Sequence, residues 1–145
     1  MRWISVSSAL LLLGCGAAPI PRPSAAFPSD DTDALEALAA FALEADARLE
    51  GADSLFVNGA EVIAAGRRRA GVPRFAGIEA GGQVALGSIR VDQAGNFAWA
   101  SFDYRWLAPD QDRFHEGRAT VVFTRVATEA GPGWRIAHIH SSLQQ

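Results

Sequence analysis

The chain has 145 residues, a formal net charge of -3 and one cysteine. All 13 basic residues are arginine and they are scattered along the chain, which argues against nucleic-acid binding, because contact with a phosphate backbone needs a concentrated basic face. The absence of lysine excludes Schiff-base catalysis on a protein amine, and the single cysteine excludes a disulfide or a thiolate metal site in the folded domain.

The N-terminal segment is typical of an export signal. Arg2 precedes an apolar stretch at 3–13, which is shorter than the roughly 20 residues that span a bilayer. The Leu-Leu-Gly-Cys sequence at 12–15 resembles a bacterial lipobox, in which the cysteine is lipidated and becomes the mature N-terminus. We therefore expect a signal peptide at 1–14 and a lipid anchor on Cys15, which multiple acylation would make firm. The expected location is the bacterial cell envelope, on the periplasmic face of the outer membrane in a Gram-negative organism; the alternative is a secreted or periplasmic protein.

A proline-rich stretch follows the cysteine. Residues 15–29 hold four of the seven prolines and almost no charge. Proline fixes φ and disfavours a helix, so this stretch is expected to be an extended tether. Residues 30–145 remain, which are enough for one domain with one core and too few for two.

The first periodic segment of this domain runs from Asp33 to Glu50. Its apolar residues recur at steps of three and four, which is typical of a helix with one buried face; they are Leu35, Leu38, Ala42, Ala45 and Leu49. Asp30 and Asp31 are suited to cap its start, and Gly51 is suited to end it.

The next segments are shorter and less regular. Residues 53–57 fit either a second short helix or a strand, Asn58-Gly59 is predicted to be a turn, and 61–65 a short strand. Residues 66–83 have no assignable pattern. The arginine cluster at 67–69 is interpreted as a solvated turn in preference to a site for phosphate or a lipid headgroup.

From Val84 onward the apolar period is two. Turn-rich segments separate four predicted strands, at 84–92, 97–107, 114–127 and 134–143. Short connections require antiparallel neighbours, so these strands should form a meander. A helix followed by an antiparallel sheet predicts an α+β domain in which the helix lies across one face of the sheet.

The C-terminal residues resemble a known family. Gly-Trp-Arg-Ile-Ala-His-Ile-His-Ser-Ser at 133–142, preceded by Arg-Ala-Thr at 118–120, is similar to the last two strands of SnoaL-like domains, which belong to the nuclear transport factor 2-like superfamily. The resemblance covers 30–145 and implies a cone-shaped α+β fold, with the N-terminal helix packed on a curved antiparallel sheet. It also implies a pocket between the concave sheet and the helix. It implies no particular reaction, because one fold carries many functions.

Alternation along the strands suggests which side chains face that pocket. One face of the last strand should carry Trp134, Ile136, His138, His140 and Ser142. A symmetric turn at 131–133 sets His140 opposite Thr120 and Ser142 opposite Arg118, and even closure of the turn at Pro109 adds Phe102, Tyr104 and Trp106 to the same face. A slip of one residue substitutes Trp99, Asp103 and Arg105. The candidate ligand-binding residues are Tyr104, Trp106, Arg118, Thr120, His138 and His140.

The histidines permit more than one role. A zinc site needs a third protein ligand, but His115 lies roughly 15 Å from His140 and Asp103 reaches the site only in the slipped register. No metal or cofactor is therefore expected, and no catalytic residue is assigned. The preferred interpretation is a non-catalytic pocket for an unknown small molecule. The alternative is a cyclase- or isomerase-type enzyme that uses a pocket histidine as general acid or base.

The opposite face of the sheet is predicted to be apolar. It would carry Ile89, Val91, Phe97, Trp99, Val121, Phe123 and Ile139, more apolar area than a monomer usually exposes. Superfamily members commonly dimerise through their sheets, so the resemblance implies a homodimer with Trp99 and Phe123 in its interface and Asp103 and Arg105 at its rim. A further alternative is a dimeric accessory subunit of an envelope complex.

Overall fold

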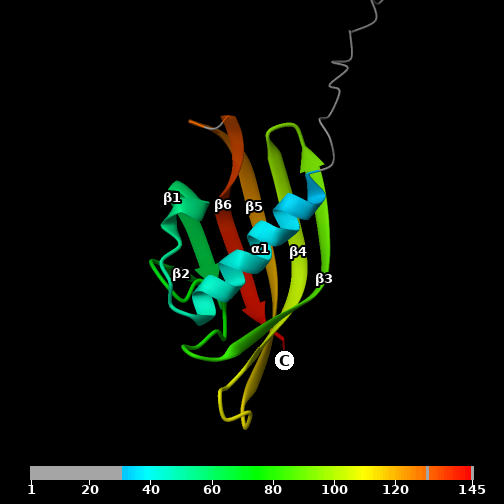
Figure 1. The fold of residues 1–145 in the computed structure, drawn as a ribbon. Helices are drawn as coiled ribbons and strands as arrows, with labels where there is room; N and C mark the ends of the chain where they lie inside the picture. The colour runs from blue at the N-terminus through cyan, green and yellow to red at the C-terminus, as the bar shows by residue number, and fades with distance from the viewer. Residues whose placement is uncertain (1–30, 130, 145) are drawn as a thin grey trace, which may run out of the picture.

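The computed structural model describes residues 31–129 and 131–144, so the expected signal peptide, Cys15 and the tether lie outside the described residues. One helix lies across a curved, open sheet of six strands in the order β2-β1-β6-β5-β4-β3 (Figure 1). We call the face of the sheet that the helix covers the inner face, and the opposite face the outer face. Within the described ranges no helix is long and apolar enough to cross a membrane.

The sheet is mixed. Its strands are β1 (Phe56–Ala64), β2 (Arg67–Arg69), β3 (Gln83–Ala94), β4 (Phe97–Leu107), β5 (Phe114–Thr128) and β6 (Gly131–Leu143). The last four form the predicted antiparallel meander. Beyond it, β1 runs parallel to β6 and pairs with β2, so the arginines predicted to form a turn form an edge strand.

The helix α1 (Thr32–Ala47) is shorter than predicted. Leu49, expected on its buried face, adopts a left-handed φ of 54° and is exposed. Asp31 precedes the helix but its side chain makes no capping hydrogen bond. Its carboxylate instead accepts a hydrogen bond of 3.0 Å from Trp134 Nε1 and pairs with Arg125, which ties the start of α1 to β5 and β6.

The segment between α1 and β1, and the start of β1 itself, also differ from expectation. A short 3₁₀ helix, η1 (Asp53–Leu55), is followed directly by β1, so Asn58-Gly59 lies within a strand and is not a turn between elements. The pairing of β1 with β6 is interrupted there, because its register shifts between Phe56 and Glu61. Gly59 accommodates the interruption with a φ of 79°.

The register of β4 against β5 is the slipped one. Asp103 lies opposite Arg118, and Leu107 opposite Phe114, because the connecting loop holds six residues closed by the hydrogen bond from Ala108 N–H to the carbonyl of Arg113 at 2.9 Å. Phe102, Tyr104 and Trp106 therefore lie on the inner face and are buried, while Trp99, Asp103 and Arg105 lie on the outer face. The expectation that Tyr104 and Trp106 share a face with Arg118 and Thr120 is wrong.

A bulge in β6 breaks its alternation. Val122 pairs with His138 and Phe123 with Ile136, so Ala137 is an extra residue on β6. The predicted pairs of His140 with Thr120 and of Ser142 with Arg118 are confirmed. The predicted single face is wrong, because Ile136 lies on the inner face with Ile139 and Ser141.

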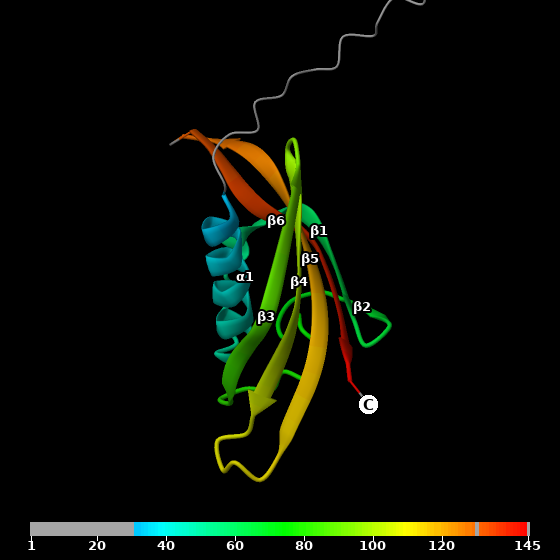
Figure 2. The same cartoon turned by 90° about the vertical axis from the view of Figure 1, so that its right-hand side faces the viewer.

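The core lies between α1 and the inner face of the curved sheet (Figure 2). Its fully buried large side chains include Leu35, Leu43, Phe75, Trp106, Val121, Phe123, Ile136 and Ile139. Val121, Phe123 and Ile139, predicted for a dimer surface, are thus buried in this core, because the slipped register places them on the same face as Phe102, Tyr104 and Trp106. Trp99 remains on the outer face, as the dimer hypothesis requires.

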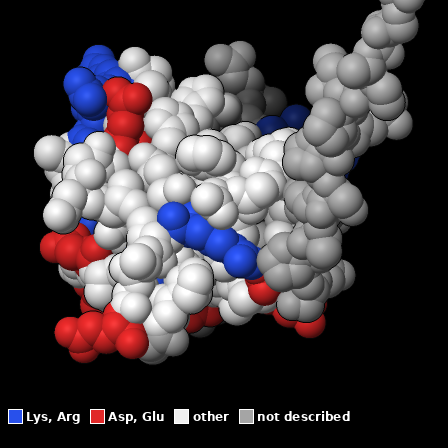
Figure 3. All heavy atoms as spheres, turned by 90° about the horizontal axis from the view of Figure 1, so that it is seen from above, with Lys and Arg blue, Asp and Glu red and all other residues white. Residues whose placement is uncertain are grey.

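The two edges of the sheet differ in kind. The β2 edge consists of three exposed arginines, and from above basic side chains gather at the corner on the β1 and β2 side (Figure 3). The β3 edge is long, but its pairing with β4 shifts between Leu86 and Ile89, which leaves Gly87 and Ser88 as a bulge.

Candidate functional site

The chain itself fills the space between α1 and the sheet, where the resemblance implied a pocket. The segment after β2, which had no assignable pattern, folds inward and inserts Phe75 into the core with no exposed surface. The Phe75 ring lies 5.8 Å from the Tyr104 ring in an edge-on arrangement and 6.2 Å from the Phe102 ring. The expectation of an open inner pocket is therefore not met by the residues described.

Hydrogen bonds hold this segment at several points. Tyr104 Oη donates to the carbonyl of Ala76 at 2.7 Å, and Trp106 Nε1 donates to the carbonyl of Glu79 at 2.9 Å. Ser141 Oγ on β6 accepts from the N–H of Ala76 at 2.9 Å. Tyr104 and Trp106, predicted to contact a ligand, thus contact the chain's own backbone.

The key anchor is Asp46, a fully buried residue of α1 that the sequence analysis did not single out. Its Oδ2 accepts the N–H groups of Arg74 at 2.5 Å and Phe75 at 2.7 Å, while its Oδ1 has no hydrogen-bond partner. Burial raises the pKa of the Asp46 carboxyl, and the two backbone hydrogen bonds partly offset this effect. A signal was present, because Asp46 continues the helical stripe of Leu35, Ala39 and Leu43, where an acid is out of place.

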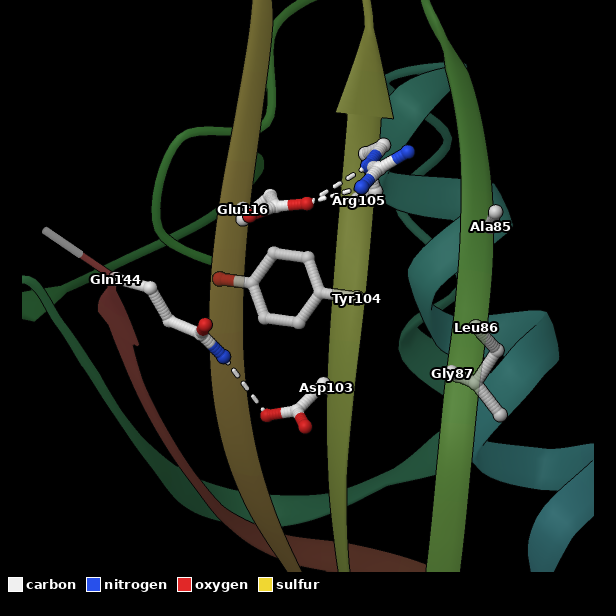
Figure 4. Close-up of a pocket in the computed structure, with 8 residues that line it drawn as sticks. All are labelled: Ala85, Leu86, Gly87, Asp103, Tyr104, Arg105, Glu116 and Gln144. Carbon is white, nitrogen blue, oxygen red and sulfur yellow. Dashed lines mark hydrogen bonds and ion pairs between the residues drawn. The ribbon is translucent and has the colours of Figure 1, made fainter.

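An open concavity lies on the outer face. A hollow of about 350 Å³ crosses β3, β4 and the start of β5 (Figure 4). Two polar pairs border it: Arg105 with Glu116, and Gln144 Nε2, which donates to Asp103 Oδ1 at 2.9 Å. Leu86, Gly87 and the largely buried Tyr104 complete its lining. We call this hollow the outer groove.

The outer groove continues along the sheet in both directions. A hollow of about 250 Å³ adjoins it at Asp103 and is lined by Ser88, Ser101, Phe102, Asp103 and Arg118. Another of about 280 Å³ adjoins it at Glu116 and Gln144. The concave surface is therefore longer than the central hollow alone.

The ionisable groups of the outer groove are poorly suited to move protons. Arg118 Nε donates to Asp103 Oδ1 at 2.8 Å, and this hydrogen bond lowers the pKa of Asp103, so its carboxylate is a weakened base. Burial raises the pKa of Tyr104 to about 12. The remaining pair, Arg105 with Glu116, is an exposed ion pair.

The predicted site residues do not converge on one place. Arg118 reaches the outer groove through Asp103, while Thr120 lies farther along β5 with its Oγ1 3.4 Å from Ser101 Oγ. His138 Nδ1 lies 3.7 Å from Glu61 Oε2 of β1, and His140 lies beside it on the outer face. Contact of these residues with a ligand stays a prediction.

No metal centre is evident in the described part of the chain, where no three acidic, histidine or cysteine side chains gather closely enough to hold an ion. His115, the remaining histidine, stacks on Trp106 with ring centroids 5.4 Å apart. Its Nε2 lies 3.7 Å from Glu79 Oε1.

Comparison with known proteins defines the family. The model of the SnoaL-like domain matches residues 24–144. No curated protein matches the chain.

Solved structures share the fold at low sequence identity. A nuclear transport factor 2-like superfamily protein from Salmonella enterica serovar Typhimurium is 19% identical, with a TM-score of 0.60, over 78% of this chain and 90% of that one. A nuclear transport factor 2-like protein with a cystatin-like fold from Novosphingobium aromaticivorans is 20% identical, also with a TM-score of 0.60, over 79% and 82%. A conserved protein from Planctomyces limnophilus is 15% identical, with a TM-score of 0.51, over 79% and 96%. At these identities the likeness concerns the fold alone.

Proposed function

Because the chain belongs to the SnoaL-like domain family, a family of nuclear transport factor 2-like fold, we propose that it is an exported, lipid-anchored protein that binds a small molecule in the outer groove without transforming it. The observation that carries the proposal is the outer groove itself, a hollow of about 350 Å³ with a polar pair at each side. This volume lies at the lower end of the range of small-molecule sites, roughly 300 to 1,000 Å³.

The polar walls of the outer groove suit recognition. Asp103 accepts hydrogen bonds from Arg118 and Gln144, and Arg105 is paired with Glu116, so each charged group already has a partner before a ligand arrives. Preorganised polar groups lose little freedom on binding, which favours affinity. Carboxylates beside guanidinium groups favour a polar ligand with both donors and acceptors.

The same pairing supports binding in preference to catalysis. The lowered pKa of Asp103 makes its carboxylate a poor general base near neutral pH, and the raised pKa of Tyr104 makes it a poor acid. Asp46, whose pKa is raised, is fully buried and out of reach of a substrate. A cyclase or isomerase that uses a pocket histidine is the less favoured alternative, because neither His138 nor His140 lines the outer groove.

The binding proposal is tested with a variant that fills the outer groove. Ala85→Tyr places a ring in the central hollow, and Ala94→Tyr is the matched control, since Ala94 is also exposed on β3 but lies outside the hollow. The full chain is purified without removing small molecules, and co-purifying compounds are identified by native mass spectrometry. We expect a compound with the wild type and the Ala94→Tyr variant but not with the Ala85→Tyr variant. Equal retention by all three contradicts the outer groove as the site.

Export and anchoring rest on the sequence at 1–29. Cys15→Ala removes the acceptor for lipid, so metabolic labelling with palmitate should be lost and the protein should move from the membrane fraction to the soluble fraction. Persistence of labelled, membrane-bound protein would contradict the assignment of Cys15.

A homodimeric accessory subunit is a second candidate function, because large apolar side chains remain in water on the outer face. Phe97 is 55% exposed and Trp99 is 39% exposed. A second copy seated there would cover Trp99, with Asp103 and Arg105 nearby. Light scattering of the wild type and of Trp99→Asp distinguishes the candidates: a dimer that the substitution dissociates favours the subunit, and a monomer in both favours the ligand groove.

A further inference from the structure

A second cleft lies at the other edge of the sheet and takes no part in the function proposed above. It has a volume of about 730 Å³ and lies between β1, β2, η1 and the segment that follows β2. Three arginines line it, Arg68, Arg69 and Arg74, against one acid, Asp53. It belongs to the side of the molecule where basic side chains gather in the view from above (Figure 3).

Arg74 is the fixed cation of this cleft. Its side chain is only 10% exposed, and its guanidinium carbon lies 4.2 Å from the centre of the Phe56 ring. Its backbone N–H is bound by the buried Asp46, which holds the residue from the other end. A guanidinium stacked on a ring and fixed in this way presents its donors in one orientation.

The counter-charge of Arg74 is held much more loosely. Arg74 Nη2 donates to Asp53 Oδ1 at 2.7 Å, yet the Asp53 side chain is 89% exposed. Water competes for the Asp53 carboxylate, because that side chain is exposed although Arg74 itself is largely buried. An external oxyanion entering the cleft can therefore replace the Asp53 carboxylate at small cost.

Arg69 supplies a second cation without a carboxylate partner among the described residues. It lies opposite Val62 in the β1–β2 pair, and its Nη1 makes one long hydrogen bond, 3.4 Å, to the carbonyl of Pro73. Arg68, by contrast, is paired with Glu61 Oε1 at 3.1 Å. Of the three arginines that line the cleft, Arg69 is thus the one without an ion pair among the described residues.

The walls of the cleft leave room for a ligand beside these cations. The break in the β1–β6 pairing between Phe56 and Glu61 turns residues 57–60 toward the cleft lining. A Cβ atom added to Gly59 or Gly71 would meet no atom within 4 Å. Phe56 and Val62 provide apolar surface beside the charges.

From these contacts we propose that the cleft binds a small ligand through an oxyanion, a carboxylate or a phosphate group, which pairs with Arg74 and Arg69 and displaces Asp53. The guanidinium fork matches the geometry of either anion. When the ligand is absent, the Asp53 carboxylate takes its place in the ion pair with Arg74. Arg68 also lines the cleft but is held in its ion pair with Glu61 of β1, so Arg69 is the arginine of β2 that is free to pair with the ligand.

The test is a titration of the full chain in neutral detergent micelles, followed by nuclear magnetic resonance of the Arg74 Nε–H and of the Gly59 and Gly71 amides. The probes are sodium succinate and sodium phosphate, with sodium chloride at equal ionic strength as the reference. We expect saturable shifts of these signals with at least one probe and none with chloride. The absence of a saturable shift with any probe, including the lipid described below, overturns the proposal.

Substitutions sharpen the test. Asp53→Asn removes the competing carboxylate and should raise the association constant about twofold to fivefold, because the ligand no longer has to displace a charged group from Arg74. Arg69→Gln should lower it about fivefold or more. Arg67→Gln is the matched control, since Arg67 is in the same strand but does not line the cleft, and it should stay within about twofold of the wild type. Equal losses for the two arginine variants, or weaker binding by Asp53→Asn, contradict the site.

The oxyanion has two possible sources, a soluble metabolite or a lipid headgroup, and a further arm separates them. Micelles are doped with short-chain phosphatidylglycerol or, as the neutral reference, with phosphatidylcholine. Shifts of the same signals with phosphatidylglycerol alone, abolished by Arg69→Gln, identify a lipid headgroup. Shifts with succinate or phosphate identify a soluble ligand, and either result supports the oxyanion site.

Discussion

Replacing Gly117 with alanine is expected to lower the free energy of unfolding by about 3 kcal/mol, although it adds a single methyl group. The Tyr104 ring lies over Gly117, so that an added Cβ would lie 2.8 Å from Tyr104 Cε1 and closer still to Cζ and Oη. Ordinary contacts begin near 3.4 Å. The ring must therefore move away from β5.

Movement of the ring also breaks its hydrogen bond. Tyr104 Oη donates to the carbonyl of Ala76 at 2.7 Å, and the buried residues Phe75 and Phe102 leave the ring no free space. Overpacking costs about 1 to 3 kcal/mol, and a buried acceptor left without its donor costs about 1 to 3 kcal/mol more. With an m-value of about 1.5 kcal/mol per M, the urea midpoint should fall by about 2 M.

The assay is urea unfolding followed by tryptophan fluorescence. Gly51→Ala is the matched control, because its Cβ would meet nothing closer than 3.6 Å and should change the midpoint little. In a Tyr104→Leu background the ring is gone, and the effect of Gly117→Ala should shrink to less than about 1 kcal/mol. An unchanged effect in that background would refute the contact between Tyr104 and Gly117 as the cause.

Three further predictions concern the contacts that hold the inserted segment and the start of α1. Ser141→Ala removes the acceptor of the buried N–H of Ala76 and should lower the free energy of unfolding by about 1 to 3 kcal/mol, whereas Ser142→Ala, an exposed neighbour, should change it little; equal effects would contradict the role of Ser141. Burial raises the pKa of Asp46 above its ordinary 3.8, so its stabilising contribution is present below that pH and is lost as the pH rises through the native pKa. Relative to Asp46→Asn, the wild type should lose stability as the pH rises above 3.8, and a relative gain would contradict the assignment. Arg125→Gln removes the ion pair with Asp31 and the stacking on Trp134 at 4.8 Å, so it should speed hydrogen exchange in the first turn of α1 by about fivefold, while Arg90→Gln, which is paired within its own strand, should not; equal rates in both variants would argue against the tie.

Long alternating segments made most of the fold predictable. The four strands from β3 to β6 are adjacent in sequence and joined by short turns, so local pattern alone indicates their pairing. The pairing of β1 with β6 was missed because Val62 and Ile139 are far apart in sequence and no local signal joins them. Parallel pairing at that distance depends on the whole core.

The site was harder to predict because it depends on register. Even closure of the Pro109 turn put Tyr104 on the wrong face, yet the apolar alternation of Ala119, Val121 and Phe123 matches that of Phe102 and Tyr104 in the slipped register. Matching the apolar sets of neighbouring strands would have found it. The bulge at Ala137 has no such signal. Strict alternation along the strand therefore placed Ile136 and His138 on one face, whereas the bulge places them on opposite faces.

The inserted segment illustrates a different limit. Phe75 follows a stretch rich in glycine and arginine that shows no periodicity, and its place in the core is fixed by Asp46, 29 residues earlier. A lone acid on a buried helical face is a readable signal of a tertiary anchor. The residues that it holds cannot be named from pattern alone.

The bulge at Gly87 and Ser88 affects whether many copies of this protein can lie side by side without aggregating. A lipid anchor would confine many copies to a two-dimensional layer. There, the long free edge of β3 could pair with the edge strand of a neighbouring copy and start fibril-like polymerisation. The interruption between Leu86 and Ile89 removes a continuous ladder of backbone donors and acceptors along that edge, and the opposite edge ends in three like charges. Both open margins of the sheet are thereby protected, so crowding at a surface need not lead to strand-by-strand aggregation.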